Sequence, residues 1–553
     1  MPSDRAEEAD ALPSPERFRQ RARELALPVP DAYNIAAATC DRWAEGGRVA
    51  MVDLGGAEPR VWSFEEFRSQ SRRLAHGLAG LGVTKGSRVA ILLPQGAAAA
   101  TAHLAVYRLG AIAVPLATIH GSDALGHRIE DSGPVVGVTD LDSWARLDGT
   151  DLALACRWVV TDGLDDETIP SSLTSLAETI AQGSDRPVDV TVQADTPAMI
   201  VYTSGTTGMP KGAVHAHRVV AAHAGPIRLA HDEFPCDRDL LWSPADWAWA
   251  GGLIDCLLSA WHAGVPIVAF RGRGFDPDQV MEMMATHAVR NTFLPPTALK
   301  MLLAASPGQA EGLDLRTIMT GGEPVARDII DASVDAFGVV PNAVYGQTEA
   351  SCLVGSSSGL LPVRPGAMGM PYPGYDIDLL DDDGHSADQG EVAVRGEAAG
   401  MFLGYWRQPE ATDAKYRHGC LMTGDLARRD EDGYLWFVAR ADDIIISAGY
   451  RIGPAEIEAC LERDPNVRAA AAVGVPDAER GQVIRAVVEL AVDVDDTDSL
   501  ADELSARVRR ELAPYEVPRE FEFVAELPRT TTGKLSRVAL RDAAPSQSTE
   551  VTS

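Results

Sequence analysis

The feature that most constrains the fold is a repeated alternation of short apolar segments with helical ones. RVAILLP (88–94) is typical of a buried strand, AAAATAHLAVYRLG (97–110) of a helix, and AIAVPLA (111–117) of a second buried strand. A helical segment at 122–132 and the strand-like VVGVTD at 135–140 follow. Four further strand candidates continue the pattern: PAMIVYTS (197–204), VPIVAF (265–270), AVRNTFLPP (288–296) and LRTIMTGGE (315–323). Buried strands that alternate with helices predict an α/β fold, with parallel sheets covered by helices on both faces.

The chain of 553 residues is too long for a single hydrophobic core, so we expect at least two domains. After about residue 370 the pattern changes. YDIDLLDDDGHSADQGEVAVRG (375–396) predicts antiparallel strands with a turn at Asp383-Gly384, and RRDEDGYLWFVAR (428–440) predicts a further hairpin. These segments predict a β-barrel-like subdomain that completes the large N-terminal domain.

Beyond Arg440, helical and strand-like segments alternate over about 110 residues, which predicts a small α+β domain. We place the boundary near Ala441-Asp442. The predicted domains are therefore 1–441 and 442–553, with a disordered tail at about 544–553.

The net charge of −31 argues against nucleic acid or anionic lipid as a partner, because both attract basic surfaces. The chain contains only five lysines: Lys85, Lys211, Lys300, Lys415 and Lys534. The remaining 44 of its 49 basic residues are arginines. Two interpretations remain open: a bias toward arginine codons, or adaptation of an acidic surface to high salt.

Cysteine usage and apolar patterning predict a cytoplasmic location. None of the seven cysteines forms a C-x-x-C pair, and their scattered placement is typical of a reducing compartment. The acidic N-terminal segment lacks the apolar region of a secretory signal. His103, Arg108 and Pro115 interrupt the most apolar stretch, which predicts a buried helix and strand rather than stable insertion into a membrane.

A loop rich in glycine and hydroxyl groups, YTSGTTGMPKG (202–212), follows one predicted strand. Its glycines let the backbone approach an anion, and Ser204, Thr206, Thr207 and Lys211 supply hydrogen-bond donors and charge. It is not a Walker A loop, since Met209 and Pro210 separate Gly208 from Lys211. A flexible polar turn is the alternative when the loop is considered by itself.

The loop and several later segments together resemble the acyl-adenylate-forming superfamily, which includes acyl-CoA synthetases, peptide-synthetase adenylation domains and firefly luciferase. The resemblance covers about 30–542 and is closest in type to medium-chain and acetyl-CoA synthetases. The further matching segments are TGGEP (320–324), YGQTEAS (345–351), MTGD (422–425), ARADDIIISAGYRIGPAEIE (439–458) and LPRTTTGKLSR (527–537).

The resemblance implies that ATP and an acid form an acyl-adenylate and that CoA then accepts the acyl group. It implies that Lys534, Glu349, Thr348 and Lys211 are catalytic, with Glu349 as the Mg²⁺ ligand. A carboxylate such as Asp425 would accept hydrogen bonds from the ribose. The implied ATP- and AMP-binding residues are Thr203, Ser204, Gly205, Thr206, Thr207, Gly208, Lys211, Gly321, Gly322, Glu323, Pro324, Tyr345, Gly346, Gln347, Thr348, Asp425, Arg440 and Arg451.

Members of this family use a mobile small domain twice, first for adenylation and then for attack by the thiol. Asp442 matches the hinge position, and Gly449 and Tyr450 match the CoA tunnel. Arg451 would contact nucleotide phosphate in the first orientation. SPADWAWAGG (243–252) corresponds to the acyl-pocket segment.

Trp249, Asp246 and Gly346 are the predicted acyl-pocket residues. Acetate-specific relatives carry tryptophan where this chain has Gly346, so we expect an acid larger than propionate, such as a medium-chain or branched fatty acid. Trp247 departs from the usual pattern and could reshape the pocket, so an aromatic acid remains an alternative substrate.

Several alternatives remain: an acetyl-, propionyl- or aryl-CoA ligase, a stand-alone enzyme that loads a carrier-protein pantetheine, or a non-enzymatic nucleotide-sensing relative. A homodimer is compatible with the sequence.

Overall fold

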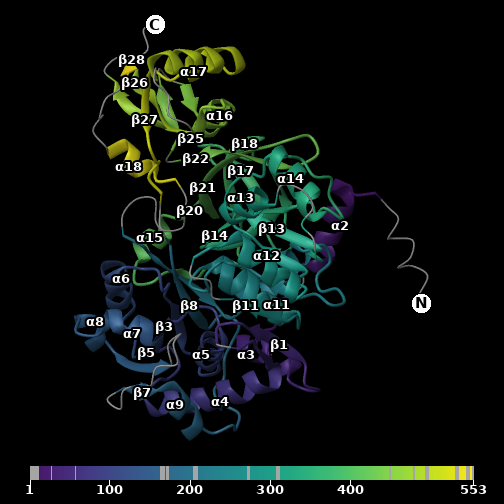
Figure 1. The fold of residues 1–553 in the computed structure, drawn as a ribbon, viewed down its shortest axis with the longest axis vertical. Coiled ribbons are helices and arrows are strands. Elements are labelled where there is room, and N and C mark those ends of the chain that lie inside the picture. The colour runs from purple at the N-terminus through teal and green to yellow at the C-terminus, as the bar shows by residue number, and fades with distance from the viewer. Residues whose placement is uncertain are drawn as a thin grey trace.

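Three β-sheets follow one another along the long axis of the molecule (Figure 1). This computed structural model describes residues 12–26, 28–56, 58–161, 169, 173–203, 209–270, 274–306, 310, 312–441, 443–447, 450–477, 480–491, 497–529, 535–542 and 549–550.

The first sheet has eight strands, of which six consecutive ones are parallel. Two antiparallel strands complete it at the edge where the chain returns from far along the sequence. In spatial order its strands are β19 (Gly404–Tyr405), β9 (Gly212–Ala216), β8 (Pro197–Tyr202), β4 (Ile112–Pro115), β3 (Arg88–Leu92), β5 (Val136–Asp140), β6 (Arg157–Thr161) and β7 (Thr174–Ser175).

The second sheet has fourteen strands. One half is parallel apart from an antiparallel strand at its outer edge, and the other half is antiparallel. The change occurs at one strand, β14, which is parallel to β13 on one side and antiparallel to β15 on the other. In order its strands are β17 (Ile377–Leu380), β18 (Gln389–Arg395), β21 (Cys420–Arg429), β22 (Leu435–Arg440), β16 (Ala367–Pro371), β15 (Ala350–Gly355), β14 (Asn342–Gln347), β13 (Thr317–Gly321), β12 (Asn291–Phe293), β10 (Leu241–Trp242), β11 (Ile267–Ala269), β1 (Val49–Asp53) and β2 (Arg60–Ser63), with β20 (Tyr416–Arg417) beside β21.

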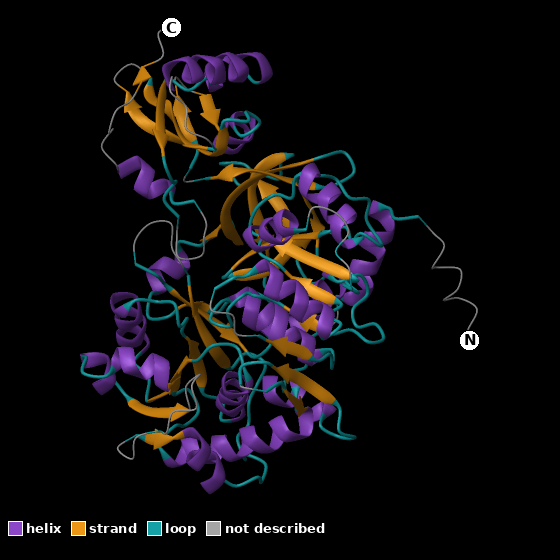
Figure 2. Cartoon of the chain, in the orientation of Figure 1, coloured by secondary structure: helices purple, strands orange, loops and turns teal. Residues whose placement is uncertain are grey.

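Helices cover both faces of these two sheets and fill the space between them (Figure 2). Ala102, Leu253 and Trp261 belong to the shared core between the sheets. Leu125 and Ile129 pack on the outer face of the first sheet, as Met284 and Leu302 do on the second. The helices of the large domain are α2 (Pro15–Leu25), α3 (Ile35–Thr39), η1 (Asp41–Trp43), α4 (Phe64–Gly80), α5 (Ala97–Arg108), α6 (Ser122–Ser132), α7 (Leu141–Leu147), α8 (Asp151–Leu154), α9 (Leu176–Gln182), α10 (Val219–Ala230), the π-helix η2 (Gly251–Leu258), α11 (Ser259–His262), α12 (Pro277–Thr286), α13 (Pro296–Ala305), α14 (Arg327–Phe337) and α15 (Pro409–Asp413).

The third sheet lies at the C-terminal end of the molecule and has separate cores on its two faces. Ile457, Leu504 and Phe521 lie in one core, and Val475 and Leu540 lie in the other. Its elements are β23 (Ile445–Ser447), β24 (Tyr450–Ile452), α16 (Pro454–Leu461), β25 (Val467–Asp477), β26 (Gly481–Leu490), α17 (Thr497–Glu511), η3 (Pro514–Glu516), β27 (Glu520–Val524), α18 (Arg537–Asp542) and β28 (Thr549–Glu550).

The predicted fold class is confirmed: a large α/β domain precedes a small α+β domain. The predicted antiparallel strands are present, but they continue the second sheet instead of forming a sheet of their own. This continuity matters for the site, because strands from both halves of the sheet contribute residues to it. Among the described residues, every helix is too short or too polar to cross a lipid bilayer.

Candidate functional site

The turn between β14 and β15 lies where the second sheet changes its pairing. Gln347 and Ala350 pair across the two strands, so Thr348 and Glu349 occupy the turn itself. The Thr348 carbonyl accepts a hydrogen bond from Nε2 of His215, in β9, at 2.8 Å. Burial lowers the pKa of His215 to about 4, so its ring is neutral at pH 7 and Nε2 carries the proton. This hydrogen bond holds the turn at the junction of the first two sheets.

Glu349 is a buried carboxylate with an aromatic partner. The hydroxyl of Tyr405, in β19, donates to Oε1 of Glu349. The Nζ atom of Lys211 lies 5.2 Å from the centroid of the Tyr405 ring. Burial, together with the charge of Glu349, raises the pKa of Tyr405, which keeps the phenol protonated as a donor. The phosphate-loop lysine and the predicted Mg²⁺ ligand therefore contact the same tyrosine.

Asp425 lies in β21 opposite Arg440 of β22. Its Oδ2 accepts a hydrogen bond from the hydroxyl of Tyr345 at 2.6 Å, and its Oδ1 accepts one from Nη1 of Arg440 at 3.2 Å. Burial and the negative charge of Asp425 raise the pKa of Tyr345 well above its ordinary value. Three predicted nucleotide-binding residues thus meet at one carboxylate. The stacking of Tyr345 on adenine stays a prediction, to which the structure adds an orienting hydrogen bond.

The segment predicted to bind adenine follows β13. A Cβ atom on Gly321 would lie 2.4 Å from the carbonyl oxygen of Val344, so β13 and β14 approach too closely for a side chain. Gly322 has a φ of +108°, which favours glycine. The backbone and side chains at 322–324, including Glu323 and Pro324, are exposed. Residues 322–324 are therefore accessible at the surface, and the adenine contact stays a prediction.

Gly346 lies in an irregularity of the β14–β15 pairing. A Cβ atom at this position would lie 2.5 Å from the backbone nitrogen of Cys352 and 2.9 Å from backbone atoms of Ser351. Cys352 itself has a φ of +51°. The close approach of the two strands therefore requires glycine here for a local reason, and the room it leaves for a longer acyl chain stays a prediction.

The segment predicted to line the acyl pocket forms a turn before η2. Oδ1 of Asp246 accepts from the backbone N–H of Ala248 at 2.8 Å, and burial raises the pKa of Asp246 to about 6. Trp249 is half-buried and meets the His120 ring edge-on, with 5.7 Å between centroids. Trp247 is 2% exposed and belongs to the main hydrophobic core. Its surroundings favour a packing role over the reshaping of a pocket.

The two described ends of the phosphate loop are joined. The backbone N–H of Thr203 donates to the carbonyl of Lys211 at 2.9 Å. Nε2 of His127, in α6, lies 2.8 Å from the carbonyl oxygen of Pro210, so α6 braces the exit from the loop. The predicted loop residues outside the described part of the chain are Ser204, Gly205, Thr206, Thr207 and Gly208.

The small domain carries five of the predicted site residues, and the structure describes two of them. Asp442, Gly449 and Lys534 lie outside the described residues. Tyr450 and Arg451 are placed as backbone positions in β24, which pairs with β23. Their roles as hinge, CoA tunnel, catalytic lysine and phosphate contact stay predictions.

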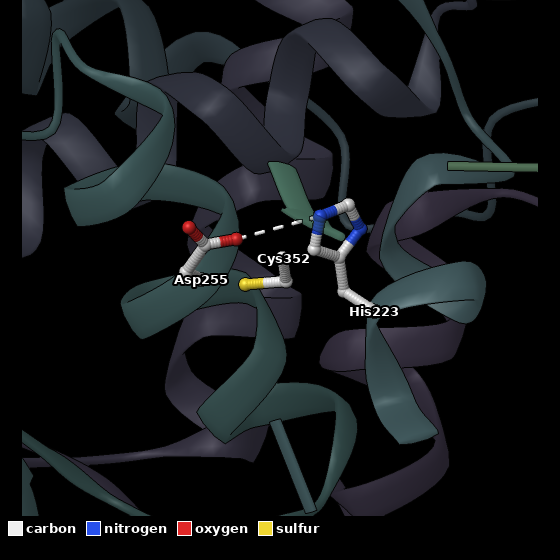
Figure 3. A group of neighbouring side chains, drawn as sticks. All are labelled: His223, Asp255 and Cys352. Carbon is white, nitrogen blue, oxygen red and sulfur yellow. Dashed lines mark ion pairs between the residues drawn. The ribbon is translucent and has the colours of Figure 1, made fainter. Parts of the chain in front are cut away.

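A buried group of three potential metal ligands lies behind the site, formed by His223, Asp255 and Cys352 (Figure 3). Nδ1 of His223 donates to the Val219 carbonyl at 2.6 Å, which leaves a lone pair on Nε2, 3.5 Å from Oδ1 of Asp255. The Ser351 hydroxyl donates to the other Asp255 oxygen at 2.7 Å. Burial raises the pKa of Asp255 and of the Cys352 thiol. All three side chains are buried, and we interpret the group as structural.

Sequence reasoning missed three residues that contact the predicted site: Tyr405, His215 and Lys415. Tyr405 lies in the edge strand β19 and His215 lies in the neighbouring strand β9, and both are brought to the turn only by the meeting of two sheets. Lys415 donates to Oε1 of Gln347 at 3.0 Å. Only Lys415 carried a signal in the sequence, as one of five lysines in an arginine-rich chain.

Comparisons with known proteins agree with this geometry. Residues 40–406 match the family model of the AMP-binding enzyme, and residues 456–534 match that of the AMP-binding enzyme C-terminal domain. The chain is 32% identical to an uncharacterized acyl-CoA ligase, YtcI, from Bacillus subtilis, over 93% of this chain and 97% of that protein. It is also 32% identical to the mitochondrial acyl-coenzyme A synthetase ACSM4 of Rattus norvegicus, over 93% and 91% of the two chains.

Two solved structures extend the likeness to the fold. A Brucella canis acyl-CoA synthetase is 31% identical, with a TM-score of 0.73, over 96% of this chain and 98% of that one. ATP-bound MatB from Rhodopseudomonas palustris is 26% identical, with a TM-score of 0.81, over 92% and 98%.

Proposed function

The chain belongs to the AMP-binding enzyme family as an AMP-forming acyl-CoA synthetase, and from this premise we propose that its acid is a medium-chain or branched fatty acid larger than propionate. In the first half-reaction the carboxylate attacks the α-phosphate of ATP and pyrophosphate leaves. In the second half-reaction the CoA thiol attacks the acyl carbonyl, the bond to AMP breaks, and the thiol proton is released.

The observation that carries the proposal is the grouping of residues from two sheets around the β14–β15 turn. Asp425 binds Arg440 and the Tyr345 hydroxyl of β14, and Lys211 shares Tyr405 with Glu349, which lies in the turn. In this proposal Asp425 binds the ribose hydroxyls, and Thr348 and Lys211 contact phosphate. Fixed donors and charges of this kind stabilise a transition state in which negative charge develops.

The residues present fit the Mg²⁺ ion that the family uses. Glu349 offers a buried carboxylate, whose hard oxygens suit a hard cation, and Tyr405 orients it from one side. When bound there, Mg²⁺ would offset the negative charge of the triphosphate. Lys211 and Lys534 would supply further positive charge, Lys534 from the small domain.

Two features support an acid longer than propionate. The 439–458 segment resembles medium-chain acyl-CoA synthetases, and Gly346 stands where acetate-specific relatives carry tryptophan. Each buried methylene would contribute about 0.8 kcal/mol, so neighbouring chain lengths would differ only a few-fold in kcat/KM.

One assay tests the proposal: AMP release with acetate, butyrate, octanoate, isobutyrate and benzoate, each with and without CoA. We expect CoA-dependent AMP release that is greater with octanoate, butyrate or isobutyrate than with acetate. A clear preference for acetate would overturn the proposed acid. If the acid supports ATP–pyrophosphate exchange but added CoA does not lead to turnover, loading of a carrier protein is favoured. If no AMP is released with any acid, a nucleotide-sensing relative is favoured. A cytoplasmic location and a homodimer stay predictions.

A further inference from the structure

Lys415 lies between α15 and β20, and its side chain contacts Gln347 at the end of β14. Its backbone is fixed to β21, because the Lys415 carbonyl accepts a hydrogen bond from the backbone N–H of Met422 at 2.8 Å. Its N–H donates to the Thr412 carbonyl at 3.0 Å. The long side chain therefore starts from a defined position and reaches into the site.

The ammonium group of Lys415 has three acceptors around it. Nζ lies 3.0 Å from Oε1 of Gln347, 3.3 Å from the Met422 carbonyl and 3.4 Å from the Thr423 carbonyl. A lysine ammonium has three N–H donors, so these acceptors match its full capacity. Nε2 of Gln347 in turn donates to the Thr423 carbonyl at 3.0 Å. Lys415 and Gln347 thus form a closed set of hydrogen bonds with β21.

The strand that these groups hold carries Asp425, two residues beyond Thr423. The hydroxyl of Thr423 accepts from the backbone N–H of Asp425 at 3.1 Å. Glu349 and Asp425 are among the charges that act on Lys415. The lysine side chain is therefore the cation that joins the segment predicted to bind adenine and Mg²⁺ to the strand predicted to bind ribose.

We propose that Lys415 is a positioning residue for the nucleotide: it fixes the amide of Gln347 and, through β21, holds Asp425 and the β14–β15 turn at the spacing that ATP requires. This inference deepens the proposed function and depends on its assignment of the nucleotide site. It gives a role to a lysine that lies outside every motif in the sequence.

The test uses the full-length enzyme and a double-mutant cycle. Lys415→Met keeps the apolar stem and removes all three donors, and Gln347→Met removes their side-chain acceptor. We expect each substitution to raise the KM for ATP and weaken ATP binding in calorimetry by about tenfold, the order expected for hydrogen bonds to a charged group. The KM for the acid should stay within about twofold, since the acceptors around the Lys415 ammonium belong to β14 and β21 and not to the acyl segment 243–252.

The cycle separates this role from a general loss of stability. If Lys415 acts through Gln347, the double variant should be no worse than the more impaired single variant. Lys415→Arg, which keeps charge and donors, should recover part of the affinity for ATP. Lys85→Met is the matched control, because Lys85 donates to one carbonyl, that of Thr191, at 2.9 Å on an exposed loop. It should leave both constants unchanged.

Three results would overturn the inference: unchanged ATP binding in Lys415→Met, additive effects in the double variant, or an equal loss in Lys85→Met. Calorimetry keeps this outcome separate from that of the proposed function. If the wild-type enzyme binds ATP but releases no AMP with any acid, the proposed function fails while the Lys415 cycle is still decided by binding. Wild-type protein that does not bind ATP would overturn both.

Discussion

Burial of one carboxyl group, that of Asp246, makes the stability of the folded state depend on pH. Its pKa is raised to about 6, whereas the pKa of an aspartate in an unfolded chain is about 3.9. Between these values the folded state binds more protons than the unfolded state, so the folded state loses stability as the pH rises from about 4 to about 6. Above pH 6 the carboxylate is charged in both states and the full destabilisation is present.

We therefore expect Asp246→Asn to raise Tm more at pH 7.5 than at pH 4.5, because the amide stays neutral and its oxygen can still accept from the Ala248 N–H. Thermal denaturation of both proteins at the two pH values measures the effect. Asp502→Asn, at an exposed position of α17, is the control and should give no pH-dependent difference. An equal Tm difference at both pH values for Asp246→Asn would contradict the assigned pKa.

Lys534 is the residue whose predicted role is most specific to one half-reaction. Its ammonium would stabilise the charge that develops at the α-phosphate during adenylation, and the thiol step has no such need. We expect Lys534→Ala to slow ATP–pyrophosphate exchange by at least about 100-fold. Thioester formation from a supplied acyl-adenylate should persist. Lys85→Ala is the control, and exchange at the wild-type rate in Lys534→Ala would refute the role.

At the scale of elements, the β14–β15 hairpin depends on Gly346. A Cβ atom there would meet the backbone of Cys352 at 2.5 Å, and backbone cannot move aside as a side chain can. We expect Gly346→Ala to lower the free energy of unfolding by about 1–3 kcal/mol, a typical cost of overpacking, and to raise the KM for ATP through displacement of the adjacent turn. Denaturant unfolding and initial rates measure the two effects.

The matched control for this change is Gly80→Ala at the end of α4, where an added Cβ would have nothing within 4 Å. Alanine is the better helix former, so this variant should be as stable as wild type or slightly more so. If Gly346→Ala is equally harmless, the strands have room for a side chain and the local requirement for glycine is wrong.

Elements were predicted well from the sequence because each depends on local pattern. The helix expected at 122–132 is α6, and the strand expected at 135–140 is β5. The motifs that carry the predicted site residues could also be recognised, since each motif is a short run of sequence, and the roles of those residues stay predictions. Contacts across sheets were not: Tyr405 lies 56 residues from Glu349 and His215 lies 133 residues from Thr348. No periodicity in either segment indicates which distant strand it will meet.

At the scale of the whole molecule, the site depends on the junction of the first two sheets. The first sheet supplies Tyr405 from its edge strand and His215 from the next strand, and the second sheet supplies the turn and Asp425. The small domain is proposed to add Lys534 in one orientation and the CoA tunnel in another. A boundary near residue 442 would allow this change without disturbing either of the first two sheets.

The charge of the whole molecule leads to the last prediction. A net charge of −31 disfavours the compact state through self-repulsion, and salt weakens this repulsion. Arginine already supplies the cation in most of the ion pairs between described residues. An exception is the pair of Lys300 and Glu323, in which Nζ lies 3.5 Å from Oε2. Acidic residues nevertheless outnumber basic residues by 80 to 49, so a large excess of negative charge remains.

If the acidic surface is an adaptation to salt, Tm should rise as KCl increases from about 0.1 M to about 1 M, where the Debye length falls from about 10 Å to about 3 Å. AMP release should be retained or increased over the same range. Sorbitol at matched osmolality is the control, because an excluded neutral solute stabilises compact states without screening charge. If KCl raises Tm no more than sorbitol does, self-repulsion is not limiting, and a bias toward arginine codons becomes the better account of the composition.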